Sequence, residues 1–156
     1  MSDGGSRVFR GSGQPGSNGQ VASLAHRRRA RKLEREVQVR FARTDCLVRT
    51  REGSVAAHRG DAIITGTAGE QWRVSRSHFD AKYRPGPDTA NGADGGYVSR
   101  PYEIHAVRME EPFEVLLTDG ASRLHGREGD WLVDYGDGSL GIVAPEIFDG
   151  TYALVD

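Results

Sequence analysis

Residues 129–152 read Gly-Asp-Trp-Leu-Val-Asp-Tyr-Gly-Asp-Gly-Ser-Leu-Gly-Ile-Val-Ala-Pro-Glu-Ile-Phe-Asp-Gly-Thr-Tyr, and this stretch decides the fold of the chain. Two apolar runs flank Asp137-Gly138, which is the strongest short hairpin signal in the sequence. Pro145 suits the first position of a helical turn, because its missing N–H has no partner there in any case. The stretch therefore predicts a strand, a tight turn, a second strand, a helical turn and a closing strand over Thr151 to Val155.

An earlier stretch matches this one when the sequence is shifted by 69 residues. Gly60-Asp61 then meets Gly129-Asp130, and the match runs without a gap over residues 60–84. Seven of the twenty-five positions are identical, and they are residue types that turns or buried faces require. In the earlier stretch these are Gly60, Asp61, Gly69, Val74, Phe79, Asp80 and Tyr83. The spacing predicts a tandem repeat of about fifty residues, although any two hairpin-rich stretches share Gly-Asp pairs and alternating apolar residues.

The composition changes along the rest of the chain. Residues 1–20 are mostly small and polar, so we expect a disordered tail that buries too little apolar surface to offset chain entropy. Residues 21–36 are rich in Ala, Leu, Arg, Lys and Glu, which predicts a basic helix of moderate stability because like charges stand four residues apart. Residues 86–96 combine Gly, Pro, Asp and Asn and are expected to form a flexible linker.

A hydrophobic period of two begins at Val37 and indicates half-buried strands. The first repeat is therefore predicted over residues 37–85 and the second over residues 97–156. The fold class that follows is mainly β, with a minor α+β character. We expect two tandem β-rich repeats, each with a short helical turn, packed as small half-barrel or sheet lobes and preceded by the basic helix.

The charge distribution is lopsided, although the formal net charge is −1. Residues 1–87 carry seventeen basic and eight acidic side chains, whereas residues 88–156 carry four basic and fourteen acidic ones. A field that changes sign along the chain favours docking of one half on the other, or self-association through the opposite charges of the two halves. It argues against a nucleic-acid site on the second repeat, where phosphates would be repelled.

Cysteine usage and hydropathy indicate a cytoplasmic protein. Cys46 is the only cysteine, so the chain has no internal disulfide and suits a reducing compartment. There is no apolar run long enough for a membrane span, and no apolar core behind a basic start as in a secretory signal.

The second copy resembles the PGDYG family of short bacterial and phage proteins. The residues that carry the resemblance are Pro101-Tyr102-Glu103-Ile104-His105-Ala106-Val107, Gly129-Asp130-Trp131, Pro145-Glu146-Ile147-Phe148 and Tyr152. The first copy is similar at Gly60-Asp61, Gly69-Glu70, Phe79 and Tyr83. Glu128 and Trp131 replace the Pro and the Tyr of the family pattern. The resemblance implies two tandem copies of a fold module and carries no catalytic residue.

Candidate ligand-binding residues cluster around the repeated Gly-Asp pairs; they are Asp61, Asp130, Trp131, Tyr135 and His125. Asp61 and Asp130 could be a symmetry-related pair of ligand-binding carboxylates. The interpretation that we favour is an Asx-type turn, in which each carboxylate accepts backbone N–H groups at the start of a strand. Trp131 could line a pocket, but covering one end of a core is the more common role for such a residue.

The sequence predicts neither a metal, a cofactor nor a catalytic residue. None of the five histidines has ligand spacing to Cys or to another His. There is no nucleophile elbow, phosphate loop or dinucleotide fingerprint. A basic run could neutralise phosphates of a nucleic acid, or could be a solvated or docked segment; its residues are Arg27, Arg28, Arg29, Arg31, Lys32 and Arg35.

Three functional hypotheses follow. The first is a non-enzymatic binding or regulatory module that engages a protein or small ligand at the junction of the two repeats. The second is a nucleic-acid-associated protein that uses residues 26–35 as a basic arm. The third is a small enzyme with its site in a cleft between the repeats, where Asp61, Asp130 or His125 would act as acid–base groups.

Overall fold

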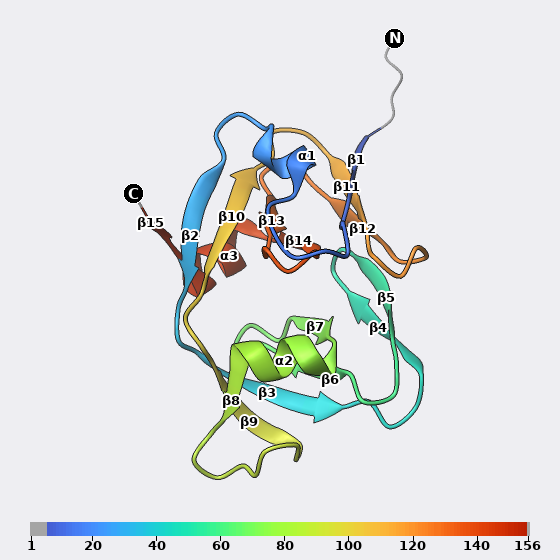
Figure 1. The fold of residues 1–156 in the computed structure, drawn as a ribbon, viewed down its shortest axis with the longest axis vertical. Helices are drawn as coiled ribbons and strands as arrows, with labels where there is room; N and C mark the ends of the chain where they lie inside the picture. Colours follow the sequence, from blue (N-terminus) through green and yellow to red (C-terminus); the bar gives the residue numbers. More distant parts are fainter. Residues whose placement is uncertain (1–5, 156) are drawn as a thin grey trace. The chain divides into compact units, whose positions relative to one another are not determined.

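The computed structural model describes residues 6–155, which divide into two compact units (Figure 1). Unit 1 contains the residues up to Arg31 together with those from Glu103 onward, and unit 2 contains Lys32–Tyr102. The chain therefore leaves unit 1 once and returns to it once. Both units consist mainly of strands, as the hydrophobic period predicts. Among the described residues no helix is long and apolar enough to cross a membrane.

Unit 2 is built from an open five-stranded sheet and a separate two-stranded hairpin. The sheet has the strand order β7-β6-β3-β9-β8, and the hairpin pairs β4 with β5. The elements in chain order are β3 (Glu36–Phe41), β4 (Cys46–Thr50), β5 (Gly53–Ala57), β6 (Ala62–Thr65), β7 (Gln71–Val74), α2 (Arg76–Lys82), β8 (Tyr83–Pro85) and β9 (Gly95–Ser99).

Unit 1 combines an open five-stranded sheet with a three-stranded one. Their strand orders are β14-β13-β10-β2-β15 and β1-β11-β12, with β1 parallel to β11. The elements in chain order are β1 (Arg7–Arg10), α1 (Gly19–Ala22), β2 (Arg28–Lys32), β10 (Glu103–Arg108), β11 (Phe113–Leu116), β12 (Arg123–Gly126), β13 (Trp131–Asp134), β14 (Leu140–Val143), α3 (Pro145–Thr151) and β15 (Tyr152–Val155). The last residue of β2, Lys32, is the first residue of unit 2.

The two five-stranded sheets agree strand by strand. Each has an edge hairpin in the same register: Ala62 pairs with Val74 in unit 2, and Trp131 pairs with Val143 in unit 1. Each hairpin adjoins a central strand, β3 or β10, and each sheet ends with the short strand that follows its helix. The fourth strand is unusual in both sheets. β2 precedes β3 in the sequence but pairs with β10, whereas β9 precedes β10 but pairs with β3.

The helix of each unit buries one aromatic residue on its sheet. Phe79 in α2 and Phe148 in α3 are both buried, and each donates its N–H to the residue four positions earlier, at 2.8 Å. Phe79 stacks on Tyr83 with ring centroids 5.0 Å apart, and Phe148 stacks on Tyr152 at the same distance. In unit 1 Trp131 adds a second stacked ring, 4.0 Å from Phe148. Aromatic burial on this scale dominates the packing of both small cores.

The predicted basic helix over residues 21–36 is wrong. Only Gly19–Ala22 is helical, and Arg28–Lys32 forms a strand between β10 and β15. Ala30 is fully buried there, while Arg29 and Arg31 are exposed, so the segment follows a period of two. Pairing with two neighbouring strands overrides the weak helix preference of a segment whose like charges repel one another at helical spacing.

The predicted tail and linker also need correction. Residues 1–5 lie outside the described part of the chain, but residues 7–10 form β1, and Phe9 is buried edge-to-face against Phe113. Within the predicted linker at 86–96, residues 95 and 96 already belong to β9. The predicted start of the second repeat, residue 97, lies inside β9, which pairs with β3 of unit 2. These strands were missed because their partners lie far away in the sequence.

Candidate functional site

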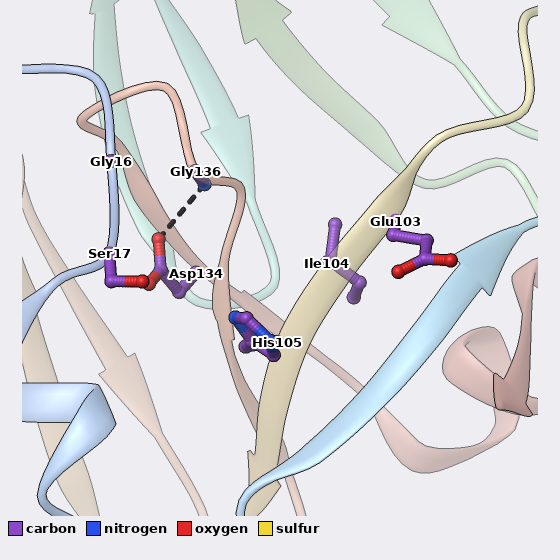
Figure 2. A pocket seen from close by; sticks show the side chains of 7 residues that line it. All are labelled: Gly16, Ser17, Glu103, Ile104, His105, Asp134 and Gly136. Atoms are coloured by element: carbon purple, nitrogen blue, oxygen red, sulfur yellow. Dashed lines mark hydrogen bonds between the residues drawn. The ribbon is translucent and has the colours of Figure 1, made fainter. Parts of the chain in front are cut away.

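A pocket of about 230 Å³ lies within unit 1, beside the central strands of its five-stranded sheet. Its polar side chains come from β10, from the end of β13 and from the loop before α1 (Figure 2). The lining residues are Gly16, Ser17, Glu103, Ile104, His105, Asp134 and Gly136.

Sheet register places three of these side chains on one face. His105 in β10 lies directly opposite Asp134 in β13, and on its other side it lies opposite Arg29 in β2. Directly opposed residues in an antiparallel pair project from the same face. Glu103, two residues before His105 on the same strand, shares that face because the side-chain period of a strand is two. The register thus gathers two carboxylates and an imidazole from segments far apart in the sequence.

Asp134 is the buried acid of the pocket. Its side chain belongs to a residue only 3% exposed. Its Oδ1 accepts the Gly136 N–H at 2.9 Å, and its Oδ2 accepts the Asn18 N–H at 3.0 Å. Figure 2 shows the carboxylate with Ser17 and His105 on either side of it in that view. A carboxylate has acceptor capacity for about four hydrogen bonds, so these two backbone donors leave acceptor capacity on Asp134.

Among residues 6–155, no ion pair joins the Asp134 carboxylate to a basic side chain. Arg29, the nearest arginine in the sheet register, pairs instead with Glu103, with 3.5 Å between Nη1 and Oε1. A buried carboxylate without a cation is costly, because protein dipoles replace only part of its hydration. The pocket is therefore electrostatically suited to a positively charged ligand.

The wall opposite the sheet is the N-terminal loop that was expected to be disordered. Gly13 donates its N–H to Gly138 O at 2.9 Å, and Gly16 donates to Gly136 O at 2.9 Å, which ties the loop to the β13–β14 turn. Asn18 then caps α1, since its Oδ1 accepts the Gln20 N–H at 2.9 Å. Asparagine is one of the preferred N-cap residues. That cap and the apolar Phe9 were the sequence signals for order in this segment.

The predicted ligand-binding aspartates lie elsewhere and close turns. Asp61 Oδ2 accepts the His58 N–H at 2.8 Å and the Arg73 Nε–H at 2.7 Å. Asp130 Oδ2 accepts the Arg127 N–H at 2.9 Å, and the residue is only 1% exposed. Each carboxylate bonds back to the backbone three residues earlier, which is the geometry of a side chain that stabilises a turn. Neither residue lines the pocket.

The other three predicted ligand-binding residues also lie outside the pocket lining. Trp131 is buried in the stack on Phe148. Tyr135 adjoins Asp134 in the sequence, but its ring lies over Gly141, where an added Cβ would come within 2.9 Å of Cε2. His125 is exposed on β12, opposite Glu114 of β11. Asp61 belongs to unit 2, whereas the other four residues belong to unit 1.

The basic run of residues 27–35 forms part of a sheet rather than a free arm. Arg29 is paired with Glu103, and Lys32 is buried. Arg27, Arg31 and Arg35 are exposed, and Arg28 is half-buried. Nucleic-acid binding by this run stays a prediction.

A second hollow, of about 450 Å³, lies within unit 2 next to the turn that precedes β6. Its charged residues are exposed, and Arg43 and Asp94 partly neutralise one another across 3.6 Å. Exposed ion pairs of this kind contribute little and are largely screened by water. The pocket of unit 1 is the stronger candidate because its acid is buried.

The residue types around Asp134 do not form a catalytic triad in this geometry. Ser17, His105 and Asp134 line the same pocket, but none of the described hydrogen bonds joins the serine to the histidine or the histidine to the aspartate. An activated nucleophile needs its base within about 2.6–3.2 Å. No group of three or more His, Cys, Asp or Glu within residues 6–155 is placed to hold a metal ion.

Comparison with known families gives one match. The model of the family described as PGDYG protein matches residues 53–153, which is more than half of the chain. The chain belongs to the PGDYG family. The matched span is continuous from β5 to β15, so it includes the Gly-Asp turns of both units and every residue of the pocket except those of the N-terminal loop. Searches of the curated proteins and of the solved structures find no match.

Proposed function

We propose that this PGDYG protein is a non-enzymatic binding module that holds a small organic cation in the pocket of unit 1. The observation that supports it most is the buried Asp134 carboxylate, which lines the pocket and has backbone donors but no cation among the described residues. A ligand ammonium or guanidinium group would supply the missing positive charge. A charge-assisted hydrogen bond of this kind is roughly twice as strong as a neutral one.

The pocket also limits the size and chemistry of the ligand. Its volume of about 230 Å³ is below the roughly 300–1,000 Å³ usual for drug-sized ligands. Glu103, His105 and Ser17 add hydrogen-bonding groups around the acid. These features favour a small ligand with one cationic head over an extended peptide.

We further propose that the module arose from two tandem copies of one β unit. Support comes from the identical strand order of the two five-stranded sheets and from hairpins that share their register at a spacing of 69 residues. The turns before β6 and β13 add to it, because Gly60 and Gly129 both have φ 93° and donate to Ala42 O and Met109 O. A binding site at the junction of the copies stays a prediction.

An NMR titration of the ¹⁵N-labelled full chain tests cation binding. The probes are n-butylammonium and n-butanol, which are similar in size but differ in charge, at a fixed total salt concentration. We expect saturable shifts of the Asn18 and Gly136 amides with butylammonium alone, because both amides donate to Asp134. For a fragment-sized cation the dissociation constant should be on the order of millimolar.

Two variants identify the charge that is responsible. Asp134→Asn removes it and should weaken butylammonium binding about tenfold or more, which corresponds to the loss of about 1.4 kcal/mol. Asp149→Asn, at an exposed position of α3, removes an equal charge from the same unit and should leave binding unchanged. If Asp134→Asn is unstable, Glu103→Gln should still weaken binding. Equal shifts with butanol, or full binding by Asp134→Asn, would overturn the proposal.

A further inference from the structure

The chain contains only two lysines, Lys32 and Lys82, against nineteen arginines. Both lysines belong to unit 2, and both lie at one aromatic ring, that of Tyr102. Their Nζ atoms are 5.8 Å and 4.9 Å from its centroid, respectively. Arginine does not lose its proton in proteins, whereas lysine can become a neutral amine. Both lysine amines of the chain therefore lie in this one cluster.

Lys32 is enclosed by aromatic side chains. The residue is 5% exposed, and its Nζ lies 5.6 Å from the Trp72 centroid and 5.5 Å from that of Tyr83. Its Nζ–H donates to Tyr83 Oη at 3.4 Å. Trp72, Tyr102 and Lys82 are themselves only half-buried. The amine is thus buried beneath side chains that are themselves partly exposed.

The position of the amine is fixed by the backbone. Lys32 ends β2, and its N–H donates to Tyr102 O at 2.8 Å. Tyr83 follows α2 directly and is held by its stacking on Phe79. Trp72 belongs to β7 at the edge of the sheet. Three separate segments of unit 2 therefore hold the cluster.

The same surroundings make the amine easier to deprotonate. Burial first, and then the ammonium of Lys82, lower the pKa of Lys32 from 10.5 to about 8, while Glu70 acts in the opposite direction. About a tenth of the Lys32 side chains are then neutral at pH 7, far more than for an ordinary lysine. A desolvated lysine beside a second cation is a known arrangement for imine-forming amines.

We propose that Lys32 is a nucleophilic amine that forms a reversible imine with a small 2-oxo acid, whose carboxylate is held by Lys82. The neutral Nζ attacks the ketone carbon and gives a carbinolamine. Loss of water from the carbinolamine forms the C=N bond, and the imine nitrogen takes up a proton from the solvent. The rings of Trp72 and Tyr102 contact the short carbon chain of the acid. This site lies in unit 2 and is independent of the cation pocket of unit 1.

Reductive trapping of the full chain tests this inference. The protein is incubated with pyruvate and sodium cyanoborohydride at pH 7.5, which reduces each imine to a stable N-(1-carboxyethyl) amine, and the modified sites are mapped by mass spectrometry. We expect Lys32 to be modified about tenfold faster than Nα-acetyllysine in the same solution. Lys32 should also be modified faster than Lys82.

Variants separate nucleophilicity from simple access. Lys82→Arg keeps a positive charge for the carboxylate and should retain modification at Lys32, whereas Lys82→Met should slow it with pyruvate but less with acetone, which has no carboxylate. Lys32→Arg should leave only the slower sites. The unmodified sequence alone is decisive if these variants do not fold. Modification of Lys32 no faster than that of Nα-acetyllysine would overturn the proposal.

Discussion

At the scale of single residues, two ionisable side chains occupy places that a purely structural role does not require. Asp134 is a buried carboxylate beside a pocket, and Lys32 is a buried amine among aromatic rings. An apolar residue of similar volume at either place would avoid the cost of burying a charge. Asp61 and Asp130 are also buried and accept backbone N–H groups, but neither lines the pocket. The position beside a pocket, or beside a second lysine, is therefore what supports the roles proposed for Asp134 and Lys32.

The lowered pKa of Lys32 predicts a specific dependence of stability on pH. Between about pH 8 and 10.5 the folded protein has released the Lys32 proton while the unfolded chain still holds it. The free energy of unfolding therefore rises with pH across this window, and the full cost of the buried charge is present below it. Relative to Lys32→Met, the unmodified protein should gain about 2 kcal/mol between pH 7 and 9.5.

Urea denaturation at the two pH values measures this difference, because the comparison with Lys32→Met cancels the groups that titrate in both proteins. The parallel variant Lys82→Met should raise the pKa of Lys32, since it removes the neighbouring ammonium. It should therefore shrink the gain. Identical pH dependence of the unmodified protein and Lys32→Met would contradict the assignment.

At the scale of elements, the pocket depends on the contact between the N-terminal loop and the β13–β14 turn. Gly138 is essential to this contact, because an added Cβ would lie 2.5 Å from Gln14 N and 2.7 Å from Gly13 C. Both of those atoms are backbone, so the clash is not relieved by a side-chain rotation. Its φ of 96° is also one that L side chains rarely adopt.

Gly138→Ala should therefore detach the loop and open the pocket. We expect a loss of about 2 kcal/mol in the free energy of unfolding, from strain and from the lost backbone hydrogen bonds. Faster amide exchange of Gly13 and Gly16 should accompany it, because both donate to this turn. Gly136→Ala is the matched control: its φ is also positive, at 77°, but its Cβ would meet no atom within 4 Å. Equal amide exchange in the two variants would contradict the role of the close contact.

Element prediction from the sequence succeeded where the pairing is local. The β13–β14 hairpin, the helical turn at Pro145 and the closing strand follow from signals within a few residues. It failed at β1 and β2, whose partners, β11 and β10, lie about a hundred and about seventy residues away along the chain. The composition of residues 21–36 favours a helix locally, and only the distant partner strand reverses that preference.

The candidate site could not be predicted for the same reason. Asp134 follows three buried apolar residues and has no motif around it, and His105 is one of five histidines without ligand spacing. Their relation appears only in the register that pairs β10 with β13. Repetition in the sequence points to the Gly-Asp pairs, and the structure shows that both aspartates stabilise turns. The pocket residues lie in unit 1 alone, so the match between the two stretches of sequence does not point to them.

At the scale of the whole molecule, the path of the chain between the units is the central feature. β2 and β9 occupy equivalent places in the two sheets, and each pairs with the strand that follows the other in the sequence. The last residues of these two strands also form equivalent backbone hydrogen bonds. Lys32 N–H donates to Tyr102 O at 2.8 Å, and Ser99 N–H donates to Arg35 O at 3.0 Å. If two copies of one unit form the chain, they have exchanged one strand reciprocally.

If the chain is two copies of one unit, this exchange also bears on both proposed sites. It brings Arg29 of β2 beside Glu103, with which Arg29 forms an ion pair. It also places Lys32 beside Tyr102, because Lys32 is the last residue of β2 and its N–H donates to Tyr102 O. If β2 paired with β3 instead, neither the ion pair between Arg29 and Glu103 nor the hydrogen bond between Lys32 and Tyr102 would form in this way.

Backbone NOEs in the isotope-labelled full chain test the pairing of β2 with β10 and of β9 with β3, because opposed residues in neighbouring antiparallel strands have Cα atoms about 4.5–5.5 Å apart. We expect contacts between Ala30 and Ile104, and between Val37 and Tyr97. Contacts of Ala30 with Val37, and of Tyr97 with Ile104, would mean that each strand pairs with its neighbour in sequence and would contradict the exchanged fold.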